Sequence, residues 1–124
     1  MPRLCFALDL HDDPELIAEY ERWHQPDRVW PDILASISAA GIHDLEIFRV
    51  DDRLLMVMDV AEDYSPDVKA AADSNNPRVQ AWEALMWKFQ KPLPHAKRGE
   101  KWVAMRRIFS LMEARNTAVL NQTP

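Results

Sequence analysis

Two residue types on which many enzymes depend are scarce in this chain of 124 residues: glycine occurs twice and cysteine once. With only Gly41 and Gly99, the chain cannot form a Gly-rich loop that cradles a phosphate, so we expect no nucleotide cofactor. A lone thiol cannot close an intramolecular disulfide. Because Cys5 lies in an apolar stretch, we expect it to be a small buried hydrophobic residue and not a reactive nucleophile. These features predict a protein of a reducing compartment, the cytoplasm.

Metal-binding and membrane-spanning patterns are missing as well. The sequence has no His-x-x-x-His, no Cys-x-x-Cys and no dense carboxylate cluster, so we expect neither a metal site nor another cofactor. No apolar run approaches the ~20 residues that span a bilayer, and Asp9 comes too early for a secretory signal. The formal net charge of −5 is spread along the chain, which argues against nucleic acid binding. Chemistry without metal or cofactor is limited to proton transfer or simple addition.

Apolar periodicity and prolines divide the chain into segments of secondary structure. Residues 4–10 alternate between two faces, as a strand with one buried face does. Asp13 precedes Pro14 as a helix cap, and Pro26 ends the helix that begins there. Residues 54–58 are apolar on both faces, which is typical of a central strand. The sequence predicts strands over 4–10, 42–50, 54–60 and 101–111, and helices over 14–24, 31–40, 66–72 and 77–89.

This order, β-α-β-β-α-β with both helical regions broken in two, predicts an α+β fold of the ferredoxin-like, split βαβ type. One domain covers residues 1–111, and residues 112–124 form a tail. Helices on one sheet face leave the other face uncovered, although the last strand carries apolar side chains on both sides. We therefore expect a homodimer that packs sheet against sheet, a dimeric α/β barrel. A monomer whose tail covers the sheet is the alternative.

The four histidines lie in different settings. His11 and His95 lie in a turn and a Pro-rich loop, where solvated side chains are expected, and His43 points either into a pocket or to solvent. His24 comes four residues after Tyr20, so the two share one helical face. The negative end of the helix dipole favours a protonated His24, which suits a proton donor near neutral pH.

The chain is also rich in tryptophan for its size. Five are present: Trp23, Trp30, Trp82, Trp87 and Trp102. The first four are sufficient to build a stacking floor for the apolar face of a sugar, whereas packing is the ordinary role of Trp87 and Trp102. Glu83 follows Trp82 on an otherwise apolar helix, and its carboxylate is either solvated or part of a site.

Several ordered motifs resemble those of the L-rhamnose mutarotase family, and the resemblance runs from Leu4 to about Leu111. They are EYERWH (19–24), WPDI (30–33), GIHD (41–44) and NPRVQAW (76–82). The family pattern is a tyrosine, a histidine four residues later, Trp-Pro-acid-aliphatic, and Gly-x-His before a strand. The correct intervals between these motifs make the resemblance specific.

The resemblance implies a metal-free, ferredoxin-like homodimer that interconverts the α and β anomers of a 6-deoxyhexose. The family's proton donor falls on His24, its sugar-binding tyrosine on Tyr20, and the first member of its tryptophan pair on Trp82. Two positions depart from the pattern: Glu83 replaces the second tryptophan, and Leu45 aligns with a further sugar-contacting tyrosine. Both lie in the pocket wall, so we expect retained chemistry with an altered choice of sugar, such as L-fucose in place of L-rhamnose.

Two other functions are compatible with the same architecture. One is a dimeric α/β-barrel monooxygenase, either cofactor-free or haem-linked, since fold does not fix function. The other is a non-catalytic sugar-binding or interaction module. Visible absorbance or oxygen consumption identifies the first, and sugar binding without accelerated anomer exchange identifies the second.

Overall fold

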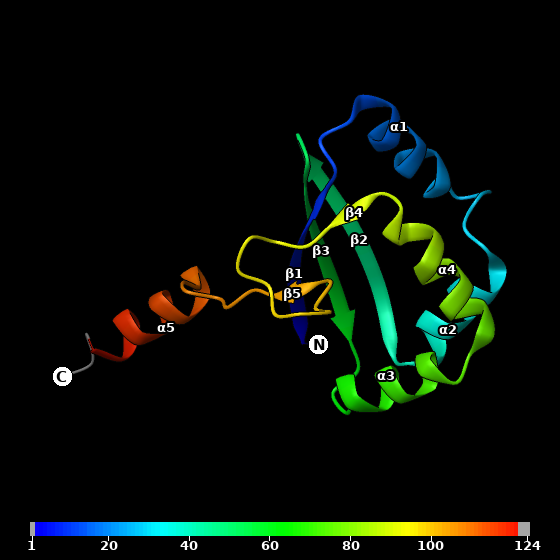
Figure 1. Cartoon of the computed structure of the whole chain (residues 1–124). Helices are drawn as coiled ribbons and strands as arrows, with labels where there is room; N and C mark the ends of the chain where they lie inside the picture. The colour runs from blue at the N-terminus through cyan, green and yellow to red at the C-terminus, as the bar shows by residue number, and fades with distance from the viewer. Residues whose placement is uncertain (1, 122–124) are drawn as a thin grey trace.

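The computed structural model describes residues 2–121, which form one antiparallel sheet with helices against one face. The elements are β1 (Arg3–Leu10), α1 (Pro14–Trp23), α2 (Pro31–Ala39), β2 (Ile42–Val50), β3 (Arg53–Val60), α3 (Pro66–Ser74), α4 (Pro77–Trp87), β4 (Gln90–Lys91), β5 (Val103–Ala104) and α5 (Leu111–Asn121). The strand order is β2-β3-β1-β4, and β5 also pairs with β1. Figure 1 shows α1 to α4 gathered beside the sheet, with α5 standing apart from them. The predicted α+β, ferredoxin-like class is confirmed.

Proline and a capping side chain set where most of these helices begin. Each of α1 to α4 has proline in its first turn, where the missing N–H costs no hydrogen bond. Asp13, Ser65 and Asn76 accept hydrogen bonds from free backbone N–H groups of α1, α3 and α4. Gly41 follows α2 with a φ of +84°, the left-handed conformation that ends many helices and favours glycine.

The sheet has a buried face and an open face. Side chains that point toward the helices form the core, with Leu8, Leu10, Leu54 and Val60 almost fully buried. On the opposite face, Leu55 and Val57 are half-buried, whereas Phe48 and Val50 are exposed. The cross-strand pair Phe48–Leu55 lies on this face together with Val50 and Val57, so the open side carries an apolar patch. Charged residues share the same face around this patch: Arg3, Asp9, Asp44, Glu46, Arg53 and Asp59.

The C-terminal part of the chain departs from the predicted pattern. We expected a strand over 101–111, but only β5 is a strand, and it pairs with Phe6 and Ala7 of β1. Met105 N–H still donates to the Cys5 carbonyl at 2.8 Å, after which the chain leaves the sheet. Alternation favours a strand, but a strand also needs a neighbour to pair with, and residues 106–110 have none within the described chain.

Other boundaries differ less. The last predicted helix ends at Trp87, and Gln90–Lys91 form the short strand β4, which pairs with Asp9 and Leu10 and was not anticipated. Most of the tail forms α5, whose side chains from Leu111 to Val119 are exposed; residues 122–124 of the expected tail lie outside the described residues. In the described chain, no helix combines the length and apolar character needed to cross a bilayer.

Candidate active site

A cavity of about 540 Å³ lies between the helical layer and the sheet. Its wall is built by residues of α1, α2, α3, α4, β2, β3 and β4 together with Trp102, so most of the fold contributes to it. All five site residues predicted from the sequence line this cavity: Tyr20, His24, Leu45, Trp82 and Glu83. The fold thus brings together residues that are separated by up to 63 positions in the sequence (83 minus 20).

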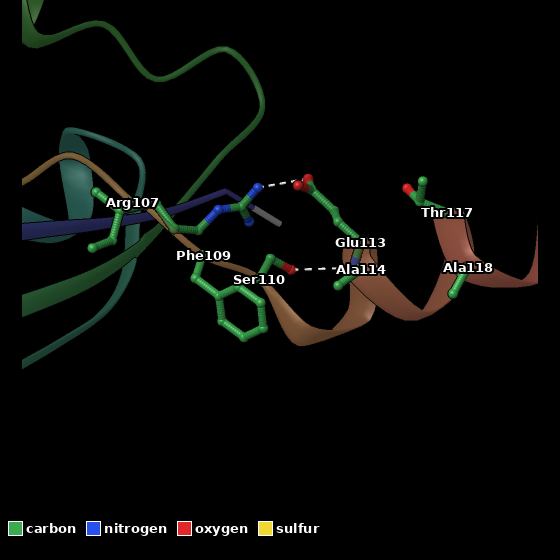
Figure 2. A pocket seen from close by; sticks show the side chains of 8 residues that line it. Arg107, Phe109, Ser110, Glu113, Ala114, Thr117 and Ala118 are labelled. Carbon is green, nitrogen blue, oxygen red and sulfur yellow. Dashed lines mark hydrogen bonds and ion pairs between the residues drawn. The ribbon is translucent and has the colours of Figure 1, made fainter. Parts of the chain in front are cut away.

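A second hollow lies between residues 107–110 and α5 (Figure 2). Arg107 Nη2 pairs with Glu113 Oε1 at 2.6 Å across it, and Ser110 Oγ accepts the Glu113 N–H at 3.3 Å. Phe109 is the one aromatic residue among those that line this hollow, and none of the predicted site residues lies there. The first cavity is therefore the candidate site.

His24 lies at the C-terminal cap of α1, with one ring nitrogen tied to the backbone. Its Nδ1 is 2.8 Å from the Tyr20 carbonyl oxygen. Because a carbonyl only accepts, Nδ1 carries the hydrogen, and the neutral ring keeps its lone pair on Nε2. Nε2 is thus the proton-accepting atom of His24, whose side chain lines the cavity.

Burial reverses the expected electrostatics of this histidine. Desolvation lowers the pKa of His24 from its usual 6.5, and the hydrogen bond to the Tyr20 carbonyl only partly opposes it. The sequence predicted that the helix dipole would favour the protonated ring, but the dipole acts at a half-buried site where a charge loses hydration. His24 is therefore a neutral base at pH 7.

Tyr20 packs beside His24, with ring centroids 4.4 Å apart, and only 3% of the residue is exposed. Burial, opposed by a hydrogen bond from Gln90 and aided by the negative charge of Glu83, raises the pKa of Tyr20 to about 12. The phenol consequently stays protonated at neutral pH. Gln90 Nε2 donates to its oxygen at 3.4 Å, which leaves the phenolic hydrogen for another acceptor.

The tryptophans divide into cavity wall and support. Trp82 and Trp102 line the cavity, whereas Trp23 and Trp30 pack edge-on against Trp82 at centroid distances of 6.2 and 5.1 Å. Trp87 is exposed on the other side of α4. The expected floor of four tryptophans is therefore wrong, because Trp82 alone of those four lines the cavity. Trp102, for which packing was the ordinary expectation, lines it as well.

Glu83 is held by a lysine that the sequence analysis did not single out. Lys101 Nζ forms an ion pair with Glu83 Oε2 and lies 4.7 Å from the centroid of the Trp87 ring. The side chain of Lys101 is mostly buried, while that of Glu83 is about half exposed at the cavity. Glu83 is thus a positioned carboxylate at the wall. The sequence signal that could have identified Lys101 is its position directly before Trp102.

The remaining histidines divide as the sequence suggested. His43 lines the cavity beside Leu45, at an irregularity of β2 between Ile42 and Asp44. His11 and His95 are exposed and lie outside it. Among residues 2–121, no three His, Cys, Asp or Glu side chains cluster closely enough to hold a metal ion.

Together these groups provide acid–base chemistry and polar recognition on an aromatic wall. A neutral imidazole can accept a proton, a neutral phenol can donate a hydrogen bond, and a carboxylate can accept hydrogen bonds from hydroxyl groups. Indole rings pack well against the apolar face of a small ring-shaped ligand. This combination fits a small polyhydroxylated substrate whose reaction moves protons.

A known protein with a similar sequence is a sugar mutarotase, and proteins of known structure share the fold. The chain is 62% identical over 114 residues to an L-fucose mutarotase of Xanthomonas campestris pv. campestris, covering 92% of this chain and 91% of that protein. The crystal structure of an L-rhamnose mutarotase from Formosa agariphila superposes with a TM-score of 0.65 at 19% identity, covering 90% and 99% of the two chains.

A polyketide cyclase, tetracenomycin F2 cyclase from Streptomyces glaucescens, superposes with a TM-score of 0.59 at 16% identity, covering 89% and 96% of the two chains. At such low identity these structural likenesses establish the fold alone. Membership rests on sequence instead, because residues 3–111 match the family described as L-rhamnose mutarotase. Together with the 62% identical relative, this match shows that the chain belongs to the L-rhamnose mutarotase family.

Proposed function

We propose that this chain interconverts the α and β anomers of L-fucose, with His24 as the residue that carries the proton. Its family and its 62% identity to an L-fucose mutarotase make it an isomerase acting on the anomers of a 6-deoxyhexose. The observation that carries the assignment of His24 is its geometry: Nδ1 is bonded to the Tyr20 carbonyl, and the ring lines an aromatic-walled cavity.

The reaction requires two coupled proton movements. His24 Nε2 accepts the proton of the anomeric hydroxyl as the bond between C1 and the ring oxygen breaks. His24 then passes this proton to the ring oxygen, which gives the open-chain aldehyde and restores the neutral imidazole. Rotation about the C1–C2 bond presents the other face of the aldehyde. The C5 hydroxyl, which was the ring oxygen, then gives its proton to His24 Nε2 as its oxygen attacks C1, and His24 passes that proton to the new anomeric oxygen.

The cavity wall supports L-fucose as the preferred sugar. L-Fucose and L-rhamnose differ in configuration at C2 and C4, so they present hydroxyl groups in different directions. We assign Trp82 to the apolar sugar face, the Tyr20 hydroxyl to a hydrogen bond with the sugar, and Glu83 to hydroxyl recognition. Leu45 leaves the wall apolar where a tyrosine would offer a hydroxyl.

We also propose that the protein is a homodimer, in which two copies pack through the open faces of their sheets. Phe48 and Val50 are exposed there, and Leu55 and Val57 continue the same apolar surface. Packing two such faces against each other removes apolar area from water in both copies. The cytoplasm remains the proposed location, for which the single cysteine is the support.

The preferred substrate can be tested by measuring anomer exchange for L-fucose and L-rhamnose side by side, using saturation-transfer NMR. We expect the protein to accelerate both reactions and to have the larger kcat/KM for L-fucose. A strong preference for L-rhamnose would contradict the proposed substrate. Sugar binding without any accelerated exchange would instead favour the binding module.

His24→Ala should lower the exchange rate of L-fucose by about 10²-fold or more, because that is the usual contribution of a general acid–base group. His95→Ala, which changes an exposed histidine outside the cavity, is the matched control and should keep full activity. Circular dichroism verifies that both variants fold. A folded His24→Ala protein with an unchanged rate would remove the central assignment.

The pH dependence follows from the lowered pKa of His24. Nε2 accepts a proton only in the neutral ring, so kcat/KM for L-fucose should be constant near pH 7 and fall as the pH drops. The midpoint should lie below 6.5, the usual histidine value, after subtraction of buffer-catalysed exchange. A midpoint above 7 would contradict the lowered pKa of His24, and a rate that rises on acidification would show that the protonated ring is the active form.

Val50→Glu should weaken the proposed dimer, because the new carboxylate would lose water in the interface. Val68→Glu, on α3, is the matched control: the two valines are 68% and 69% exposed, but only Val50 lies on the open sheet face. Light scattering across a dilution series should show the dissociation constant of Val50→Glu raised at least about tenfold. Equal effects of the two substitutions, or a monomeric wild-type protein, would argue against this interface.

A further inference from the structure

Gln90 is a buried polar residue of the cavity that sequence reasoning did not identify. It lines the cavity from β4, and only 4% of it is exposed. Its neighbour Phe89 is fully buried and accepts a hydrogen bond from His11 N–H at 2.9 Å. Gln90 itself lies opposite Leu10 of β1 in the sheet register, so the pairing with β1 holds its backbone in place.

The Gln90 amide has more hydrogen-bonding capacity than the protein uses. Nε2 donates to the Tyr20 hydroxyl oxygen at 3.4 Å. In the described chain, Oε1 is the one buried side-chain nitrogen or oxygen without a hydrogen-bond partner. Buried acceptors are normally paired, because an unpaired one has lost water without compensation. A residue that only filled space here would be more stable as an apolar side chain.

The position of this amide connects it to the site. Tyr20, which it contacts, also touches the ring of His24, and all three residues line the cavity. Met86, a wall residue in the same core cluster as Tyr20, offers no strong hydrogen bond. A substrate hydroxyl at this end of the cavity therefore finds Gln90 and Tyr20 as adjacent polar groups.

We propose that Gln90 is a sugar-binding residue whose amide hydrogen-bonds one ring hydroxyl of the substrate and thereby contributes to the choice of sugar. The proposal rests on the proposed function and deepens it. The terminal torsion of glutamine is soft, so a small rotation turns Oε1 from its buried position toward the cavity when a hydroxyl arrives. The sugar then supplies the partner that the free protein lacks.

Such a contact would select sugars by the hydroxyl that they carry. A site built to hydrogen-bond a substrate hydroxyl discriminates against an analogue without it, since the buried polar group is again left unpaired. Gln90 should therefore matter for L-fucose and lose its effect on the one deoxy analogue that lacks the hydroxyl it binds.

Gln90→Met tests this, because methionine matches the shape of glutamine without its amide. We expect KM for L-fucose to rise about five- to tenfold, the loss of one ordinary hydrogen bond, with a smaller change in kcat. The thermal midpoint should stay equal or rise, since the unpaired buried atom is gone. Gln90→Leu is the second variant, with the same expectation, should Gln90→Met fold poorly.

Gln80→Met is the matched control. Gln80 lies on α4 outside the cavity, and its Nε2 donates to the Asp73 carbonyl at 2.9 Å, so the substitution removes a satisfied surface hydrogen bond. We expect an unchanged KM for L-fucose. Measurements with 2-, 3- and 4-deoxy-L-fucose then identify the hydroxyl: for one analogue, wild-type protein and Gln90→Met should have equal KM values.

The outcomes separate this inference from the function on which it rests. If the wild-type protein does not accelerate anomer exchange, the proposed function fails and this inference fails with it. If the wild-type protein is active but both Gln90 variants keep the wild-type KM, only the role of Gln90 is overturned. A raised KM that is the same for every deoxy analogue, together with a lowered thermal midpoint, would likewise show a structural role.

Discussion

The hydrogen bond from His24 Nδ1 to the Tyr20 carbonyl controls the chemistry that the cavity can perform. It exists because α1 ends at Trp23, and the last carbonyls of a helix lack backbone partners. The His24 N–H donates to Glu21 instead, which leaves the Tyr20 carbonyl for the side chain. This bond selects one tautomer and orients the ring, so that a helix end supplies both the position and the basic nitrogen of the candidate catalytic group.

Burial then keeps the two groups beside this bond uncharged. Desolvation lowers the pKa of His24 and raises that of Tyr20, so that at neutral pH one is a base and the other a hydrogen-bond donor. Anomerisation removes one proton from the sugar and adds one, without net transfer of charge to the enzyme. Two neutral groups suit such a reaction, because neither His24 nor Tyr20 carries a charge that has to be desolvated when the sugar enters.

The rest of the fold serves this cavity from one side of the sheet. Trp23 and Trp30 support Trp82 from behind, and Lys101 holds Glu83 at the rim, so the wall is rigid where the sugar would stack. The opposite sheet face carries no described helix and keeps an apolar patch around Phe48 and Leu55. The candidate site thus lies on the helical side of the sheet, and the surface that we propose for association lies on the bare side.

Much of this protein was determined by signals that lie close together in the sequence. The four prolines that begin α1 to α4 and the alternation of residues 4–10 predicted the fold, and the four-residue spacing of Tyr20 and His24 predicted their contact, because one helical turn brings such residues together. Tertiary structure alone decided the rest. It shortened the strand predicted over 101–111, lowered the pKa of His24, and buried the amide of Gln90. Strand pairing and burial depend on residues that are distant in the chain, and local spacing carries no information about them.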